Sequence, residues 1–82
     1  PVTRGGMAAT LGTLSVIHEA QGEPSRAEAC ARRALTITEG MARAGDLDAR
    51  PRLRVALNNL AMACQSAGKA EEAGLHYRKA LD

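Results

Sequence analysis

The chain has 82 residues, a formal net charge of +2 and 45% hydrophobic residues, 17 of which are alanines. With one tyrosine as its only aromatic residue and only five Val and Ile residues, a β-sandwich or barrel is excluded and an all-α fold is predicted. The small net charge gives no argument for a nucleic-acid or membrane partner. No apolar run approaches the ~20 residues of a membrane span, and the N-terminus lacks the hydrophobic stretch of a signal peptide.

Residues 1–6, PVTRGG, are predicted to be an N-terminal tail. A first helix follows, and residues at spacings of three and four give it one apolar face: Met7, Leu11, Leu14 and His18. We expect this helix to stop at Gly22, because glycine readily adopts the left-handed conformation that closes a helix.

Pro24 suits the first turn of a second helix, which continues toward Gly45. Its small and apolar residues recur at the same spacing: Ala27, Cys30, Ala31, Ala34, Leu35, Thr38 and Met41. Residues 46–50 form the connector, in which Asp48 is a candidate N-cap for the helix that follows.

The third helix presents one apolar face and stops at Gly68. The face is made of Leu53, Leu57, Leu60, Ala61 and Cys64. The fourth helix starts near Ala70, with Glu71 and Glu72 favourably placed against the positive N-terminal end of its dipole. Its own face is made of Ala73, Tyr77, Ala80 and Leu81.

The two halves of the chain form an internal repeat. Offsetting residues 11–35 by 46 gives seven identities in 25 positions. The identities are Leu11 with Leu57, Leu14 with Leu60, Gly22 with Gly68, Ala27 with Ala73, Arg32 with Arg78, Ala34 with Ala80, and Leu35 with Leu81. We therefore predict two helical hairpins in an α-α superhelix, with residues 7–45 as the first repeat and 51–82 as the second.

The second copy reads LNNLAMACQSAGKAEEAGLHYRKAL. Its characteristic residues are Leu57, Leu60, Ala61, Gly68, Glu71, Glu72, Ala73, Tyr77 and the run Arg78-Lys79-Ala80-Leu81. This pattern resembles the tetratricopeptide repeat (TPR), most closely the variant of kinesin light chains, and the resemblance covers residues 9–39 and 55–82. The copies are 46 residues apart, whereas the TPR period is about 34, because the second helix and the linker are extended. The resemblance implies a non-catalytic scaffold that binds a protein or peptide partner.

TPR arrays bind extended peptides on the concave surface made by the first helix of each hairpin. Carried over by position, the resemblance implies a peptide-binding set of Thr13, Val16, Glu19, Asn58, Asn59, Met62 and Gln65. The amide of Asn59 carries both a donor and an acceptor and can pair with a peptide backbone. The alternative is that Asn58 and Asn59 are simply a polar helix face.

The histidines and cysteines exchange places between the copies: His18 aligns with Cys64, and Cys30 with His76. Zinc sites usually show closely spaced ligand pairs, whereas these residues are 12 apart within each copy. We therefore interpret them as packing residues and predict no metal and no cofactor. Buried free cysteines favour a reducing, cytoplasmic setting.

No phosphate-binding glycine loop, HExxH motif or nucleophile elbow occurs, so the chain is predicted not to be an enzyme. One basic cluster is present, Arg50, Arg52 and Arg54 with Arg43 nearby, but it has no aromatic partners for bases to stack on. We interpret it as a solvated helix start and predict no nucleic-acid partner.

Solenoids usually need three or more repeats, and two are present, with no polar capping helix after Asp82. The chain is therefore expected to be part of a larger repeat protein. One alternative is a self-association module, in which Tyr77 and Leu81 on the flank of the last hairpin form a homo-oligomer. Another is a regulatory segment of a larger enzyme or transcription regulator.

Overall fold

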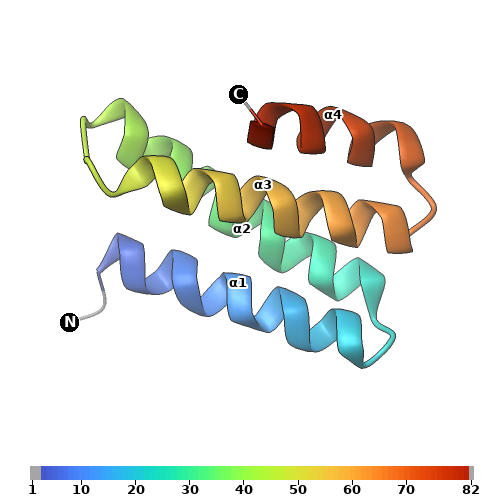
Figure 1. The fold of residues 1–82 in the computed structure, drawn as a ribbon. Helices are drawn as coiled ribbons and strands as arrows, with labels where there is room; N and C mark the ends of the chain where they lie inside the picture. Colours follow the sequence, from blue (N-terminus) through green and yellow to red (C-terminus); the bar gives the residue numbers. More distant parts are fainter. Residues whose placement is uncertain (1–2, 82) are drawn as a thin grey trace.

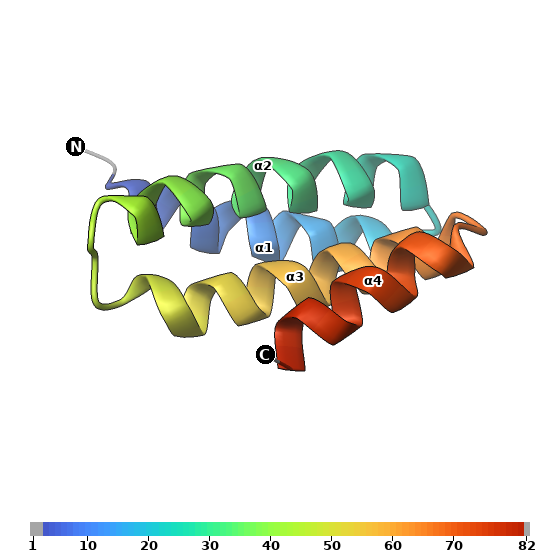
Figure 2. The same cartoon turned by 90° about the horizontal axis from the view of Figure 1, so that it is seen from above.

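The computed structural model describes residues 3–81, which form four helices and no strand. The helices are α1 (Arg4–Ala20), α2 (Pro24–Arg43), α3 (Ala49–Ser66) and α4 (Ala70–Leu81). Consecutive helices pack against each other, α3 also lies beside α1, and α1 and α4 are at opposite edges in Figure 1. The turns within the two hairpins lie at one end of the stack and the connector between α2 and α3 lies at the other (Figure 2). The predicted all-α fold of two helical hairpins is confirmed.

The three predicted helix stops are confirmed by the backbone. Gly22, Gly45 and Gly68 have φ values of 73°, 81° and 81°. After Gly68, the backbone N–H of Lys69 donates to the carbonyl of Cys64 at 2.8 Å. This bond satisfies a carbonyl that the end of α3 would otherwise leave unpaired.

Two glycine-to-alanine variants compare how an added Cβ changes stability at a left-handed backbone position and at a helical one. We expect Gly68→Ala to lower the free energy of unfolding by about 1–2 kcal/mol, because Cβ disfavours the left-handed conformation. Gly74 lies within α4, and a Cβ there meets no atom within 4 Å. Gly74→Ala is therefore expected to raise the free energy by about 0.5–1 kcal/mol. Urea denaturation followed by circular dichroism measures both, and changes of the same sign would contradict this account.

The predicted N-terminal tail, residues 1–6, overlaps the first helix. Residues 1 and 2 lie outside the described residues, and α1 begins at Arg4. Thr3 is the reason, since its hydroxyl oxygen accepts a hydrogen bond from the N–H of Gly6 at 2.9 Å and caps the helix.

The cap of α3 also differs from the prediction. Asp48 occupies the N-cap position, but its side chain accepts no capping hydrogen bond. Instead, Asp46 Oδ1 accepts from the N–H of Asp48 at 2.9 Å. The helix then starts at Ala49, inside the predicted connector at residues 46–50.

The apolar face predicted for α1 is wrong in part. Leu11 is buried, but Met7 and Leu14 are each 39% exposed. The residues buried on this helix are Ala8, Leu11 and Ser15. Small side chains let α1 approach α2 closely, and Ser15 Oγ donates to the carbonyl of Ala27 at 3.0 Å. The close contact therefore selects the small residues of α1 and leaves the larger ones at the surface.

The faces predicted for α2 and α3 are buried as expected, apart from Cys30, Leu35 and Leu53, which are partly buried. One core cluster joins Ala31, Leu60, Cys64 and Ala73, with Leu35 and Tyr77 packed against it. A second joins Leu11, Ala34 and Ala56. Among the described residues, nine of the 14 buried hydrophobic side chains are alanines. The helices therefore approach closely, and few large side chains fill the core.

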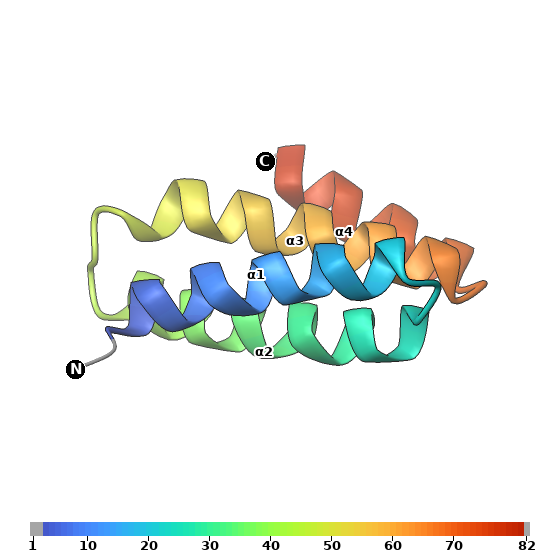
Figure 3. The same cartoon turned by 90° about the horizontal axis from the view of Figure 1, so that it is seen from below.

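Helix α4 packs against fewer neighbouring helices than any other helix in the fold. Its backbone approaches only α3, whereas α3 also lies beside α1 and α2 (Figure 3). On α4, Ala73 is buried and Tyr77 partly buried, but Leu81 is 86% exposed. The outer side of α4 is thus open to solvent in this chain.

Candidate functional site

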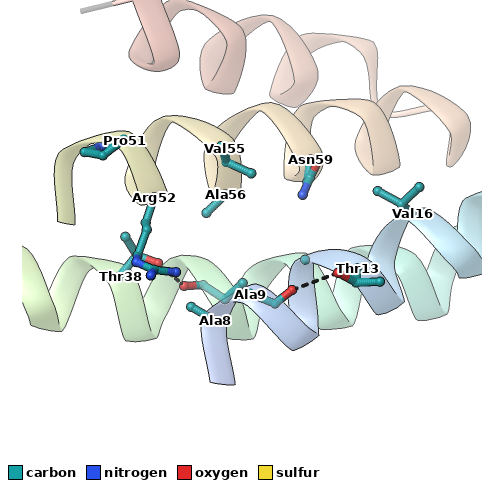
Figure 4. A pocket seen from close by; sticks show the side chains of 12 residues that line it. Ala8, Ala9, Thr13, Val16, Thr38, Pro51, Arg52, Val55, Ala56 and Asn59 are labelled. Carbon is teal, nitrogen blue, oxygen red and sulfur yellow. Dashed lines mark hydrogen bonds between the residues drawn. The ribbon is translucent and has the colours of Figure 1, made fainter. Parts of the chain in front are cut away.

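A groove of about 470 Å³ lies between α1 and α3, with α2 as its floor (Figure 4). Helix α1 contributes Ala8, Ala9, Gly12, Thr13 and Val16. Helix α3 contributes Pro51, Arg52, Val55, Ala56 and Asn59. Ala34 and Thr38 of α2 form the floor. We call this cavity the α1–α3 groove.

The α1–α3 groove is mostly apolar and contains one side-chain amide without a hydrogen-bond partner. Val16 and Val55 are 50% and 57% exposed, so solvent-exposed apolar surface is present on both sides. The hydroxyl of Thr13 uses its donor within α1, since it donates to the carbonyl of Ala9 at 3.1 Å (Figure 4). The side chain of Asn59 makes no hydrogen bond to any other residue between 3 and 81. Its donors and its acceptor are therefore available to a ligand.

Gly12 gives the Asn59 amide its space. A Cβ on Gly12 would lie 3.3 Å from Asn59 Nδ2, closer than ordinary van der Waals contact. At the end of the groove, Arg52 Nη1 donates to the carbonyl of Gly5 at 3.1 Å and ties α3 to α1. Arg52, predicted to be part of a solvated basic cluster, is partly buried instead.

The structure divides the predicted peptide-binding residues among different surfaces. Thr13, Val16 and Asn59 line the α1–α3 groove. Asn58 instead lines a second cavity of about 410 Å³ beside Tyr77 and Leu81. Neighbouring residues on a helix are about 100° apart, so the two asparagines cannot share one face.

The remaining three predicted residues contact other side chains. Met62 Sδ lies 3.9 Å from Asn58 Nδ2, on the same face of α3 as Asn58. Gln65 Oε1 accepts from the hydroxyl of Tyr77 at 3.3 Å. Glu19 accepts a hydrogen bond from the hydroxyl of Ser66.

The sequence interpretation missed the residues before Asn59 that complete the groove. Arg52, Val55 and Ala56 precede Asn59 by seven, four and three residues, which places them on the same helix face. This spacing is the signal that could have identified them, once Asn59 was taken as the reference.

A cluster of charged side chains lies outside the groove and joins the two hairpins. We call Glu28, Arg32, Lys69 and Glu72 the Glu28 cluster. Glu28, buried on α2, accepts from Lys69 Nζ at 2.9 Å and from Arg32 Nε at 2.8 Å. The hydrogen bond from Lys69 lowers the pKa of Glu28, against the opposing effect of its burial, and the same bond raises the pKa of Lys69.

Cys64 and His76 lie beside this cluster. Burial raises the pKa of the Cys64 thiol, and burial also lowers the pKa of His76. Between residues 3 and 81, Cys64, Glu72 and His76 are the one group of three or more metal-ligating residues whose donor atoms lie within 4.8 Å of one another. His18 and Cys30, at the equivalent positions of the first repeat, are not part of this group.

Each of the two hairpins matches a protein-family model. Residues 7–40 match one tetratricopeptide repeat model, and residues 55–82 match another. The chain belongs to the tetratricopeptide repeat family. The match over residues 7–40 is of the kinesin-light-chain-like type. No curated protein and no solved structure matches the chain significantly.

Membership in the TPR family gives a general role. TPR repeats mediate protein–protein interaction or scaffolding and are typically non-catalytic modules. Within residues 3–81, none of the TPR helices is long and apolar enough to cross a membrane.

Proposed function

We propose that this chain is a non-catalytic TPR module that binds an extended peptide segment of a protein partner in the α1–α3 groove. The observation that carries the proposal is the unpaired Asn59 amide on a mostly apolar, solvent-open surface. An extended peptide offers backbone N–H and C=O groups that such an amide can pair with.

The walls of the groove suit apolar side chains of the same peptide. Val16 and Val55 are half exposed on opposite sides, and burying them under a ligand removes apolar surface from water. The groove volume of about 470 Å³ falls within the range of ~300–1,000 Å³ for ligand pockets, enough for a few peptide side chains. Affinity then comes from apolar contact, and the amide orients the peptide.

Neighbouring asparagines provide a matched test of the site. Peptides selected from a random library on the wild-type protein serve as probes, and fluorescence anisotropy gives their dissociation constants. We expect Asn59→Ala to weaken binding by about 5–10-fold, the loss of one or two hydrogen bonds. Asn58→Ala, in the second cavity, should change binding by less than about twofold. Equal effects of the two variants, or none, would remove Asn59 from the site.

Self-association through the outer side of α4 is a second candidate. The supporting observations are the 86% exposure of Leu81 and the cavity of about 410 Å³ beside Tyr77 and Leu81. Leu81→Asp is then expected to shift a homo-oligomer toward monomer in sedimentation equilibrium. A wild-type chain that is monomeric at micromolar concentration would count against this role. The regulatory role in a larger enzyme or transcription regulator stays a prediction.

A further inference from the structure

Three side chains with different donor atoms meet where α4 packs on α3. Cys64 comes from α3, and Glu72 and His76 are one turn apart on α4. Cys64 Sγ lies 3.7 Å from Glu72 Oε2. Two ligands of a tetrahedral zinc ion, with Zn–S of about 2.3 Å and Zn–O of about 2.1 Å, are about 3.6 Å apart. The sulfur and the carboxylate oxygen already have this separation.

The fold holds these side chains on rigid elements. Cys64 is fully buried and belongs to the core cluster with Leu60 and Ala73. Glu72 and His76 share one face of α4 because they are four residues apart. His76 Nδ1 is buried and has no hydrogen-bond partner among residues 3–81. An unpaired buried nitrogen is unfavourable, so this imidazole has a polar atom that the rest of the chain leaves unused.

We propose that Cys64, Glu72 and His76 bind one Zn²⁺ ion per chain. Thiolate, imidazole and carboxylate are all zinc ligands, and three protein ligands leave a fourth position for water. When the Zn–S bond forms, the thiol proton of Cys64 passes to solvent.

Ion binding would change the contacts of one charged neighbour, Arg32. Arg32 donates to the same Glu72 oxygen at 2.9 Å, so binding exchanges this contact for the metal. Both side chains of that pair are about half exposed, and such pairs contribute little to stability. Arg32 keeps its second carboxylate partner, since its Nη2 lies 2.7 Å from Glu28 Oε2.

The first repeat provides an internal comparison. At the positions equivalent to Cys64, Glu72 and His76 it has His18, Arg26 and Cys30. Arg26 is a cation and has no acceptor for a metal. His18 Nδ1 is likewise buried without a hydrogen-bond partner, 4.0 Å from Glu23 Oε1, but it belongs to no group of three close donor atoms between residues 3 and 81. The site is therefore specific to the second repeat, although the cysteine and histidine are exchanged rather than lost.

Titration of the reduced, metal-free 82-residue chain with Co²⁺ tests the site. We expect one equivalent to bind, with a thiolate-to-cobalt charge-transfer band that Zn²⁺ removes by displacement. Glu72→Gln and His76→Gln should each weaken binding by at least about 100-fold, the upper end of what losing an outer-shell partner costs. Cys64→Ala should abolish the band. Far-ultraviolet circular dichroism shows whether each variant is folded.

Cys30→Ala is the matched control, because it removes the other thiol from the equivalent place of the first repeat. It should keep the band and the stoichiometry. Failure of the wild-type chain to bind one equivalent, or loss of the band in Cys30→Ala, would overturn the proposal. Glu72 is exposed, so Glu72→Gln tests the site even if Cys64→Ala does not fold. Unchanged metal binding in Glu72→Gln would also overturn the proposal.

Discussion

Leu60→Ala is expected to lower the free energy of unfolding by about 2–5 kcal/mol, the range for truncating a buried leucine. Leu60 is 0% exposed and packs against Ala31, Cys64 and Ala73. These neighbours are small and sit on three different helices, so they cannot easily move in to fill the space. Because stabilities run at roughly 0.05–0.15 kcal/mol per residue, a chain of this size loses much of its total.

Leu47→Ala is the control for this variant. The same atoms are removed, but Leu47 is 94% exposed in the connector between α2 and α3. Its effect should stay within about 0.5 kcal/mol. Urea denaturation followed by far-ultraviolet circular dichroism gives both values. A Leu60→Ala variant as stable as Leu47→Ala would mean that the core is not organised around Leu60.

Glu28→Gln is expected to lower the free energy of unfolding by about 1–2 kcal/mol at neutral pH. The carboxylate accepts charged hydrogen bonds from Arg32 and Lys69, and such bonds contribute about 1.5–3 kcal/mol. We place the effect toward the low end because the side chains of Arg32 and Lys69 are each 46% exposed and regain water when Glu28 is replaced.

The pH dependence follows from the sign of the pKa change. The pKa of Glu28 is lower in the folded chain than its ordinary value of 4.5, chiefly because Lys69 donates to the carboxylate. Its contribution is therefore fully present above about pH 4.5 and is lost as the pH falls through the folded pKa. Unfolding measured between neutral and acidic pH should show the stability difference between wild type and Glu28→Gln shrinking below that value. A difference that stays constant on acidification would contradict this role.

His76 also affects how stability depends on pH, but in a higher pH range than Glu28. Burial lowers its pKa from the ordinary 6.5, so the unfolded chain binds more protons and stability falls as the pH drops below about 6.5. The wild type and Glu28→Gln both contain His76. Its contribution therefore largely cancels in their difference, and the acidic part of the curve reports on Glu28.

The family and the helices were predictable because their signals are local or repeated along the chain. The spacing of Ala27, Ala31 and Ala34 predicts a helix with one buried face, and that face is buried. Gly22 and Gly68 mark the hairpin turns, since few other residues adopt a positive φ there. The 46-residue offset between the copies revealed the TPR pattern without any structure.

The surface residues were less predictable, because the rotation of each helix depends on its neighbours. Periodicity places Met7 and Leu14 on an apolar face, but close packing of α1 on α2 buries Ala8 and Ser15 instead. The resemblance could not separate Asn58 from Asn59. Only the position of α1 beside α3 places Asn59 in the groove.

The helices, their ends at glycine and the repeat follow from the sequence alone, since these depend on backbone preferences and on spacing along one helix. Which side chains from different helices meet depends on how the helices pack. Glu28 and Lys69 are 41 residues apart along the chain, yet they form an ion pair. The separation of Cys64 and His76 by 12 residues predicts no shared metal site, yet the α3–α4 turn brings their donor atoms within 4.8 Å of each other. Packing between helices, which no pattern along one helix records, creates these contacts.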